Sequence, residues 1–540
     1  MLVDGDARVA CVTPAARIAG RSITTLVGLS PAVREPLVDA FVATGGSQCG
    51  FCTPGILLRL AALQAKEKTS PADVERALAA HLCRCTGWQT ITEAAVLALN
   101  PTESRDFLSG DGQKHHPADK KSRNLEGAGR RAEMEGGVAQ SVGRRAPLGD
   151  AGFADDTAPR DALVAIPCPP GSAAETVSAA GIDWVIGESL TAARAAAGKV
   201  QGRRTTADGR APLPLPELPD GGVRLATGWV EPAYLEPDAS WCDPGGEPAT
   251  TLANGGAFGG KAQSVAPRAA RELADFFGRT VRTVFAREDV VRFGPKRPPI
   301  AASAVAQDGQ IVIKGVTATA VRETPTPYAV ALDARWHVER VNGPPVSDAL
   351  RAVGVAEQAV LIEGAIDAAG WDRRELLSHD ACATAVLLDT VASSETGAVA
   401  GARVDIDDAT GAVSAIHVRV DAGDPLDEVV LRSYVIGAAH MALGWVLTEG
   451  IAVDPETGEV LDLTIRSFGI IRPKSMPPVT VEILDAAMEA AASDGPRGGA
   501  SDAVFAAVAA ATWNAITRAE GMRPETFPAI ATRAARMLRR

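Results

Sequence analysis

Four cysteines in two short motifs constrain this chain more than any other feature of its sequence. Cys49 and Cys52 are separated by two residues in the first motif, and Cys83 and Cys85 by one residue in the second. Thiolates that converge from two chain segments are typical ligands of an iron–sulfur cluster. Tetrahedral zinc also takes four thiolates, so the spacing alone leaves a zinc site open. A thioredoxin-like redox pair is disfavoured because it would not need the second motif.

The residues around these cysteines predict a small helical domain. Apolar side chains recur there at helical spacing, and Ser70 followed by Pro71 is a typical helix start, since serine caps the first turn and proline fits into it. The predicted helices cover residues 31–42 and 54–65, a stretch that begins after Ser70, and residues 88–99. Before them, residues 1–27 predict short β segments, including one over Arg8–Val12.

The rest of the chain predicts a polar linker and then a mixed α/β region. Residues 101–136 are polar, charged and glycine-containing, which is typical of a flexible linker. Strands are predicted at 312–319, 402–407 and 415–420, helices at 265–277, 357–369 and 503–519, and hairpin turns within 405–413 and 453–461. The expected fold class is therefore α+β and multidomain: a small β remnant, a four-helix domain and mixed α/β domains.

Composition narrows the class of function. With 46% apolar and 22% charged residues, the 540-residue chain has the balance of a globular protein that can bury several cores. A net charge of −12 disfavours nucleic acid as a partner, because phosphate binding needs surplus Lys and Arg. The N-terminus has no secretory signal pattern, and no apolar run reaches the ~18 residues of a membrane span. Clustered cysteines in such a chain indicate a reducing compartment, so we expect a cytoplasmic protein and no membrane.

The cysteine motifs resemble those of a known family. Gln48-Cys-Gly-Phe-Cys-Thr-Pro-Gly55 and Leu82-Cys-Arg-Cys-Thr-Gly87 are similar to the helical 2Fe–2S domain of the xanthine dehydrogenase/aldehyde oxidase family of molybdenum hydroxylases. The resemblance implies that Cys49, Cys52, Cys83 and Cys85 hold a 2Fe–2S cluster, and it disfavours zinc.

The resemblance extends upstream to Leu2-Val-Asp-Gly-Asp-Ala-Arg-Val-Ala-Cys11, which is similar to the end of the family's plant-type ferredoxin domain. Cys11 stands where the family has one ligand of a second cluster, and its three partners would precede Met1. We expect either that the start codon is misassigned or split, or that this cluster is lost. The DNA upstream of the Met1 codon distinguishes the two.

A second motif, Asn254-Gly-Gly-Ala-Phe-Gly-Gly-Lys261, is rich in glycine. Such a loop exposes backbone N–H groups to a bulky anionic ligand, although a tight turn between strands has the same composition. It resembles the family's loop at the molybdenum cofactor, which implies that Gly256, Phe258 and Gly259 contact molybdopterin. The resemblance also assigns Arg351 to the cofactor and Arg297 to substrate orientation. A surface salt bridge and a solvated basic cluster are the ordinary alternatives for these arginines.

A third motif, Gly498-Gly-Ala-Ser-Asp-Ala-Val-Phe505, places Asp502 where the family has a catalytic glutamate. The resemblance implies that this carboxylate takes a proton during hydroxylation, and a dry pocket raises a carboxylate pKa for such work. Aspartate is one methylene shorter, and a misplacement of ~1 Å can cost ~100-fold in rate. The alternative is an acidic residue that favours a helix N-terminus.

Several family features are absent from the sequence. The segment between Trp241 and Thr251 lacks the strand and helix with a cofactor-binding glutamine, and no Gly-Gln-Gly occurs. Met441 replaces another glutamine, and Ala262 replaces the glutamate of purine-oxidising members, which disfavours xanthine as substrate.

Two functions therefore stay open. The first is a fused iron–sulfur and molybdenum-cofactor subunit that oxidises a small molecule, an aldehyde or N-heterocycle, within an oligomer that has FAD on a separate flavin subunit. The second is a degenerate, non-catalytic electron-transfer or scaffold subunit that keeps only the helical cluster. A zinc-binding structural domain is a third, weaker interpretation.

The resemblance also implies a division into domains. The expected parts are a ferredoxin remnant over 1–27, the helical 2Fe–2S domain over 28–100, a linker over 101–136, a shortened first molybdenum-side α/β domain over 137–225, and molybdenum-cofactor-binding domains over 226–540.

Overall fold

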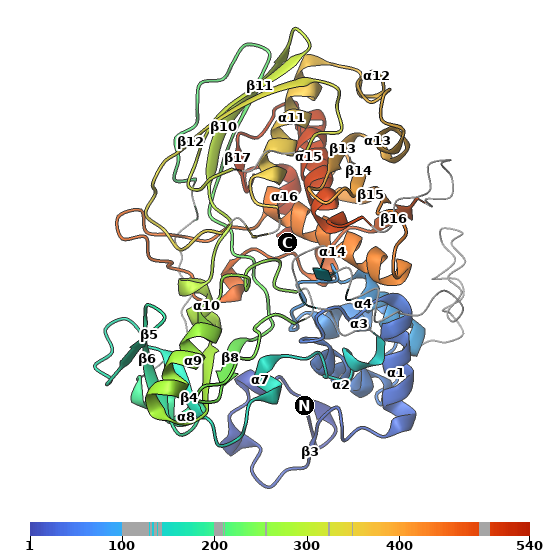
Figure 1. Ribbon diagram of the computed structural model, residues 1–540. Coiled ribbons are helices and arrows are strands. Elements are labelled where there is room, and N and C mark those ends of the chain that lie inside the picture. The colour runs from blue at the N-terminus through green and yellow to red at the C-terminus, as the bar shows by residue number, and fades with distance from the viewer. Residues whose placement is uncertain are drawn as a thin grey trace.

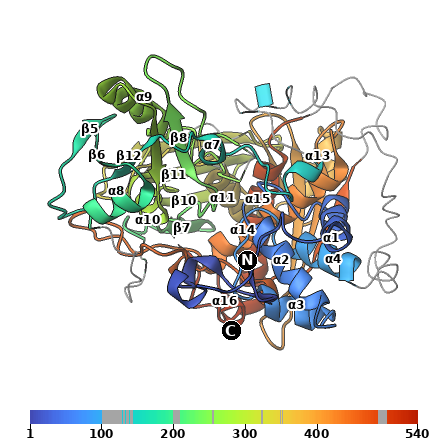
Figure 2. The same ribbon diagram turned by 90° about the horizontal axis from the view of Figure 1, so that it is seen from below.

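The computed structural model describes residues 1–99, 143–198, 211–253, 256–321, 325–347, 349–350, 352–484 and 497–539, with a few isolated positions between them. The predicted linker over 101–136 falls almost entirely outside these residues. In Figure 1 the N-terminal helices lie beside the long helix α14, and two sheet-containing lobes occupy the rest of the molecule. Figure 2 shows the same helices on the opposite side of the molecule from strands β5 and β6.

The N-terminal part contains the predicted helices and a smaller β element than predicted. The helices are α1 (Pro31–Thr44), α2 (Thr53–Gln64), α3 (Pro71–Leu78) and α4 (Gln89–Leu99), and the strands are β1 (Leu2–Val3), β2 (Asp6–Ala7) and β3 (Ile23–Thr24). Ser70 caps α3, since its side chain accepts a hydrogen bond from the Asp73 N–H. The predicted strand over Arg8–Val12 is wrong: Ala10–Val12 forms a 3-10 turn whose exposed side chains would gain nothing from packing on a sheet.

Three larger sheets build the remainder of the chain. Their strand orders are β5-β6-β4-β9-β8, β12-β11-β10-β7-β17 and β13-β14-β15-β16. The strands are β4 (Leu163–Pro167), β5 (Val177–Ala179), β6 (Ile182–Gly187), β7 (Val223–Thr227), β8 (Asp238–Cys242), β9 (Val281–Phe285), β10 (Ile300–Gln307), β11 (Gln310–Thr317), β12 (Ala331–Val338), β13 (Thr390–Ser393), β14 (Val399–Ile406), β15 (Val413–Asp421), β16 (Val479–Ile483) and β17 (Thr526–Phe527). Strands from both sides of residue 225 pair in the first sheet, and the domain limits given above remain predictions.

Helices cover these sheets. They are α7 (Ala154–Thr157), α8 (Leu190–Ala196), α9 (Ala266–Phe277), α10 (Arg287–Phe293), α11 (Val355–Ala369), α12 (Arg373–Leu376), α13 (Ala381–Val386), α14 (Glu428–Leu447), α15 (Ala500–Glu520) and α16 (Arg533–Leu538). The predicted helices at 265–277, 357–369 and 503–519 are confirmed as α9, α11 and α15. The predicted hairpin over 405–413 is confirmed as the antiparallel pair β14 and β15. The predicted turn over 453–461 is confirmed by an antiparallel bridge between Val453 and Val460.

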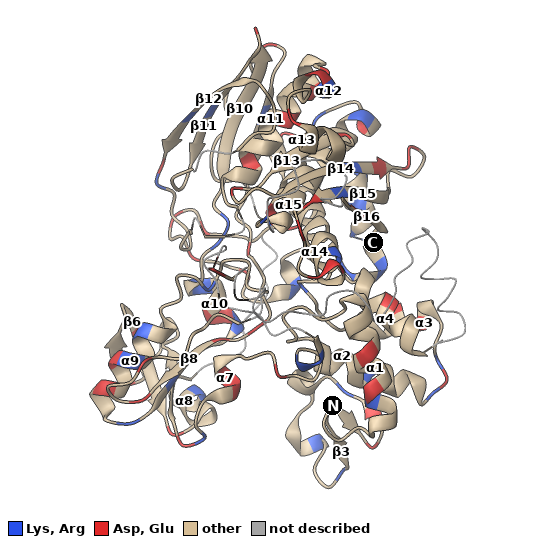
Figure 3. Cartoon of the chain, turned by 45° about the vertical axis from the view of Figure 1, so that its right-hand side comes forward, with Lys and Arg blue, Asp and Glu red and all other residues tan. Residues whose placement is uncertain are grey.

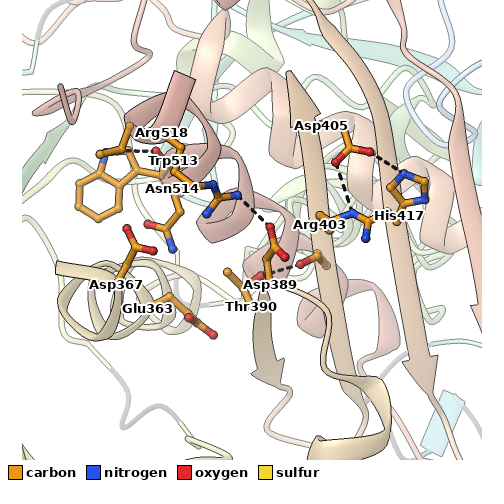
Figure 4. A network of polar contacts seen from close by, with 12 residues as sticks. Glu363, Asp367, Asp389, Thr390, Arg403, Asp405, His417, Trp513, Asn514 and Arg518 are labelled. Carbon is orange, nitrogen blue, oxygen red and sulfur yellow. Dashed lines mark hydrogen bonds and ion pairs between the residues drawn. The ribbon is translucent and has the colours of Figure 1, made fainter. Parts of the chain in front are cut away.

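The largest core joins α11, α14 and α15 to the second and third sheets. Polar contacts fix α15 on the third sheet: Asp389, just before β13, pairs with Arg518 at 2.8 Å, and Thr390 donates to the Ala507 carbonyl at 2.8 Å. Figure 4 shows this network, together with the Asp405–His417 contact across the β14–β15 hairpin. In Figure 3 acidic and basic residues are interspersed over the elements, while α15 carries few of either.

Helix α14 packs against the N-terminal helices and so connects them with the sheet-containing part of the chain. Within the described residues it alone is long and apolar enough to cross a membrane, but 78% of its apolar window is buried inside the protein. Its Arg432 forms a two-pronged ion pair with Glu93 of α4, both contacts measuring 2.8 Å. A Cβ at Gly437 would lie 1.7 Å from the Cys85 carbonyl oxygen, so the helix backbone touches the second cysteine motif. Helix α14 is therefore a core helix that packs on the cysteine loops.

Substitution of Gly437 by alanine tests this contact. The added methyl group overlaps backbone on the facing loop, so we expect Gly437→Ala to lower the free energy of unfolding by about 1–3 kcal/mol, as overpacking does. Gly55→Ala is the matched control, because Gly55 also lies in a helix and its Cβ would meet only the His81 ring at 3.9 Å. Urea unfolding of both variants is the measurement; equal effects would contradict the close contact.

Candidate functional site

The four motif cysteines lie on loops at the start of α2 and between α3 and α4. Cys52 is the N-cap residue of α2, and Cys49 lies on the loop before it. Cys49, Cys83 and Cys85 are buried, Cys52 is half-buried, and none of the chain's eight cysteines forms a disulfide. The site therefore offers four free thiols beside the N-terminus of a helix, where negative charge is favoured.

The thiols form two pairs that cross between the motifs. The Cys52 and Cys83 thiols form one hydrogen bond, and the Cys49 and Cys85 thiols form another. The hydrogen bond from Cys52 lowers the pKa of Cys83 to about 6, with help from the Thr86 hydroxyl 3.1 Å away. The bond with Cys83 and burial raise the pKa of Cys52 well above its usual value. One thiol of this pair is thus prepared to ionise first.

Paired thiols suit two iron atoms better than one zinc ion. In a 2Fe–2S cluster each iron takes two protein ligands, whereas structural zinc needs four ligands around one point. The residues present therefore fit a 2Fe–2S cluster. The assignment of the four cysteines as its ligands remains a prediction.

The glycine-rich loop packs directly on the Cys49–Cys85 pair. A Cβ at Gly256 would lie 2.6 Å from the Cys49 Cβ and 3.0 Å from the Cys85 Sγ. A Cβ at Gly259 would lie 1.6 Å from the Ala349 carbonyl oxygen. Both glycines therefore face atoms of this chain, so in this structure the loop covers the cysteines.

A cavity of about 40 Å³ adjoins the loop. Phe258 lines it, with a φ of 54° that places this residue in the left-handed region, and Arg297 and Leu350 lie on its wall. Met441 and Trp445 of α14 and Phe505 of α15 complete much of the apolar lining. The structure thus brings together two of the predicted residues, Phe258 and Arg297.

Arg297 is held inside the protein. Its guanidinium donates to Glu357 at 2.7 Å and lies 4.6 Å from the Trp445 ring centroid and 5.2 Å from that of Phe505. Glu357 also accepts the Gly354 N–H at 2.8 Å. A guanidinium that is both ion-paired and stacked is fixed in direction. Its role toward substrate remains a prediction.

The other predicted residues do not line the cavity as described. Asp502 lies half-buried in the first turn of α15, one turn before Phe505, and Phe505 rather than Asp502 reaches the cavity wall. Arg351 lies outside the described residues. The catalytic role of Asp502 and the cofactor role of Arg351 therefore remain predictions.

Two charged residues that were not assigned from the sequence stand out in the cavity wall. Arg84, between Cys83 and Cys85, donates to both carboxylate oxygens of Glu449 at 2.6 Å, and both side chains are 2% exposed. Breaking a buried pair of this kind typically costs about 3–5 kcal/mol. Arg84 stands inside the second cysteine motif, and Glu449 follows the C-terminus of α14. Their pairing joins positions 84 and 449, which no local pattern relates.

The residues around the cavity leave little free volume for molybdopterin in this arrangement. Pockets for cofactors typically measure about 300–1,000 Å³, several times the volume described here. The loop glycines meant to approach the cofactor are already packed against Cys49, Cys85 and Ala349.

His440, next to Met441 on α14, allows a test of whether water is excluded from the site. Its Nε2 donates to the Ile471 carbonyl at 3.0 Å, and within the described structure its Nδ1 has no hydrogen-bond partner. Burial, together with the charge of Arg84, lowers the pKa of His440 from 6.5 to about 4. Folding therefore favours the neutral ring.

The contribution of His440 to stability is complete above pH 6.5 and is lost as the pH falls toward 4. In this range the unfolded ring binds a proton, whereas the folded ring stays neutral. We expect His440→Gln to reduce this fall in the free energy of unfolding. Some of the fall should persist, because burial also lowers the pKa of His81 to about 4. Urea unfolding from pH 7.5 to 4.5 is the measurement, with the exposed His337→Gln as control. A His440→Gln curve parallel to wild type would contradict the assignment.

Comparison with known proteins gives matches in both halves of the chain. Residues 25–96 match a 2Fe-2S binding domain, and residues 300–477 match a molybdopterin cofactor-binding domain. A probable xanthine dehydrogenase subunit of Bacillus subtilis is 43% identical over 96 residues, which are 18% of this chain and 56% of that protein. The nicotine 6-hydroxylase small subunit of Paenarthrobacter nicotinovorans is 44% identical over 97 residues, 18% of this chain and 59% of that protein. The chain thus spans little more than half the length of these relatives.

A similar fold occurs among solved structures. The aldehyde oxidoreductase from Desulfovibrio gigas has a TM-score of 0.69 and 14% identity, over 100% of this chain and 94% of that one. This likeness supports the predicted α+β multidomain class. Together the two domain matches and the relatives show that the chain is homologous to the xanthine dehydrogenase/aldehyde oxidoreductase family of molybdenum hydroxylases.

Proposed function

We propose that this chain is an electron-transferring 2Fe–2S subunit of a molybdenum-hydroxylase-type oxidoreductase. The observation that carries the proposal is the pairing of Cys52 with Cys83 and of Cys49 with Cys85, the second pair beneath the glycine-rich loop. A bound cluster supplies reversible one-electron transfer. The protein supplies four thiolates, a dry setting and a fixed geometry.

The two cysteine pairs differ in how far the rest of the protein covers them. Gly256 and α14 cover the Cys49–Cys85 pair. Beside the other pair, Phe51 is 45% exposed and Leu82 is 38% exposed, and Cys52 itself is half-buried. Apolar residues exposed next to a redox group suit the docking of an electron partner.

The proposed partner is a flavin-binding subunit, within an oligomer. Two relatives of the N-terminal half carry names that describe them as subunits, which supports assembly with other chains. Eight free cysteines suit a reducing compartment, and we propose the cytoplasm.

A second candidate function is a complete hydroxylase that oxidises an aldehyde or N-heterocycle. It is favoured by the match of residues 300–477 to a molybdopterin cofactor-binding domain and by Phe258 and Arg297 at one cavity. In this candidate Asp502 is the base, and Gly256, Phe258, Gly259 and Arg351 contact the cofactor. The small cavity counts against it.

Metal content and cysteine variants separate these possibilities. For anaerobically purified protein we expect two iron atoms per chain and 2Fe–2S absorbance that dithionite bleaches. Cys85→Ser should lose the cluster, because one iron then lacks a thiolate. Cys168→Ser should retain it, since Cys168 is far from both motifs in sequence and its thiol contacts the Pro169 carbonyl.

The measurements are elemental analysis, visible absorbance and a dye-coupled assay with aldehydes and N-heterocycles. Zinc without iron would reject the proposal. One molybdenum per chain with turnover that Asp502→Asn abolishes would establish the second candidate instead.

A further inference from the structure

We propose that the buried Arg84–Glu449 ion pair sets the reduction potential of the cluster and positions the loop that carries Cys83 and Cys85. The inference rests on the proposed function, because it requires the cluster to be present. It assigns roles to two residues that are not ligands and that come from opposite halves of the chain.

The geometry fixes the Arg84 guanidinium completely. Its Nη1 and Nη2 donate to the two Glu449 carboxylate oxygens at 2.6 Å, and its Nε donates to the Pro232 carbonyl at 2.9 Å. All three nitrogens are therefore engaged by residues that lie far beyond the helical domain in the sequence. Because Arg84 is flanked by two proposed ligands, this anchorage also restrains the ligand loop.

Helix α14 accommodates the carboxylate side of the pair. A Cβ at Gly444 would lie 2.1 Å from the Glu449 Oε1, so the helix has no side chain where the carboxylate rests. Glu449 follows the C-terminus of α14 and is 2% exposed. The carboxylate is thus confined to one position.

The charges of this pair act on the cluster from inside the protein. A 2Fe–2S cluster with four thiolates is anionic and gains one more negative charge on reduction, and nearby charge and hydrogen bonding tune its potential. Buried charges interact more strongly than exposed ones because little water screens them. The Arg84 cation favours the reduced cluster, and the Glu449 carboxylate opposes it. Loss of one partner should therefore shift the potential in the opposite direction from loss of the other.

The chain provides a matched control at the same interface. Glu93 and Arg432 also form a two-pronged ion pair between the two halves, with side chains 11% and 17% exposed. Glu93 lies on α4 rather than on the ligand loop. Its neutralisation removes an interface charge pair without touching the segment between Cys83 and Cys85.

Spectroelectrochemical titration with dithionite and mediators tests the proposal. Each reduction transfers one electron from dithionite to the cluster and converts one ferric iron to ferrous iron, with no bond made or broken in the protein. We expect Glu449→Gln to shift the midpoint potential upward, Arg84→Gln to shift it downward, and the double variant to return close to wild type. Glu93→Gln should leave the potential unchanged while lowering thermal stability.

A purely structural role predicts a different pattern. Single variants that shift the potential in the same direction, or a double variant as far displaced as the singles, would overturn the proposal. A shift in Glu93→Gln as large as that in Glu449→Gln would do the same. If a neutral variant does not retain the cluster, Arg84→Lys decides: it keeps the positive charge, so its potential should stay close to wild type, and a large downward shift rejects the idea. A wild-type chain without 2Fe–2S absorbance would instead refute the proposed function.

Discussion

The contact between helix α14 and the Cys83–Cys85 loop is the constraint on which the rest of the structure depends. Gly437 lets the helix backbone meet the Cys85 carbonyl, and Gly87 on the loop meets the Ile436 carbonyl in the same way, since a Cβ there would lie 2.7 Å from it. Gln48 adds a bridge by donating to the Cys85 carbonyl at 3.0 Å and to the Ser433 hydroxyl at 2.8 Å. The cysteine site is therefore built by both halves of the chain.

Because both parts of the chain build this site, charged groups are buried at the interface between them. The Arg84–Glu449 pair is costly to desolvate, and it is kept because each nitrogen and oxygen has a defined partner. The glycine-rich loop completes the cover over Cys49 and Cys85. The same close packing leaves a cavity of about 40 Å³ beside the loop.

Much of this arrangement could be predicted from local sequence patterns. Helical spacing and the Ser70 cap locate α1 to α4, and the two cysteine motifs predict a metal centre. Arg8–Val12 misled the prediction because alternation alone does not supply a neighbouring strand. The ion pair of Arg84 with Glu449 and the contact of Gly256 with the cysteines could not be predicted. They depend on how distant segments pack, and no periodicity in the chain encodes that.

The central claim is that two cysteine pairs hold two irons at the seam between the halves. Iron K-edge X-ray absorption of the anaerobically purified chain tests it most directly. We expect a first shell of sulfur only and a neighbouring iron atom in the second shell. A single metal surrounded by four sulfurs, with no metal neighbour, would contradict the claim.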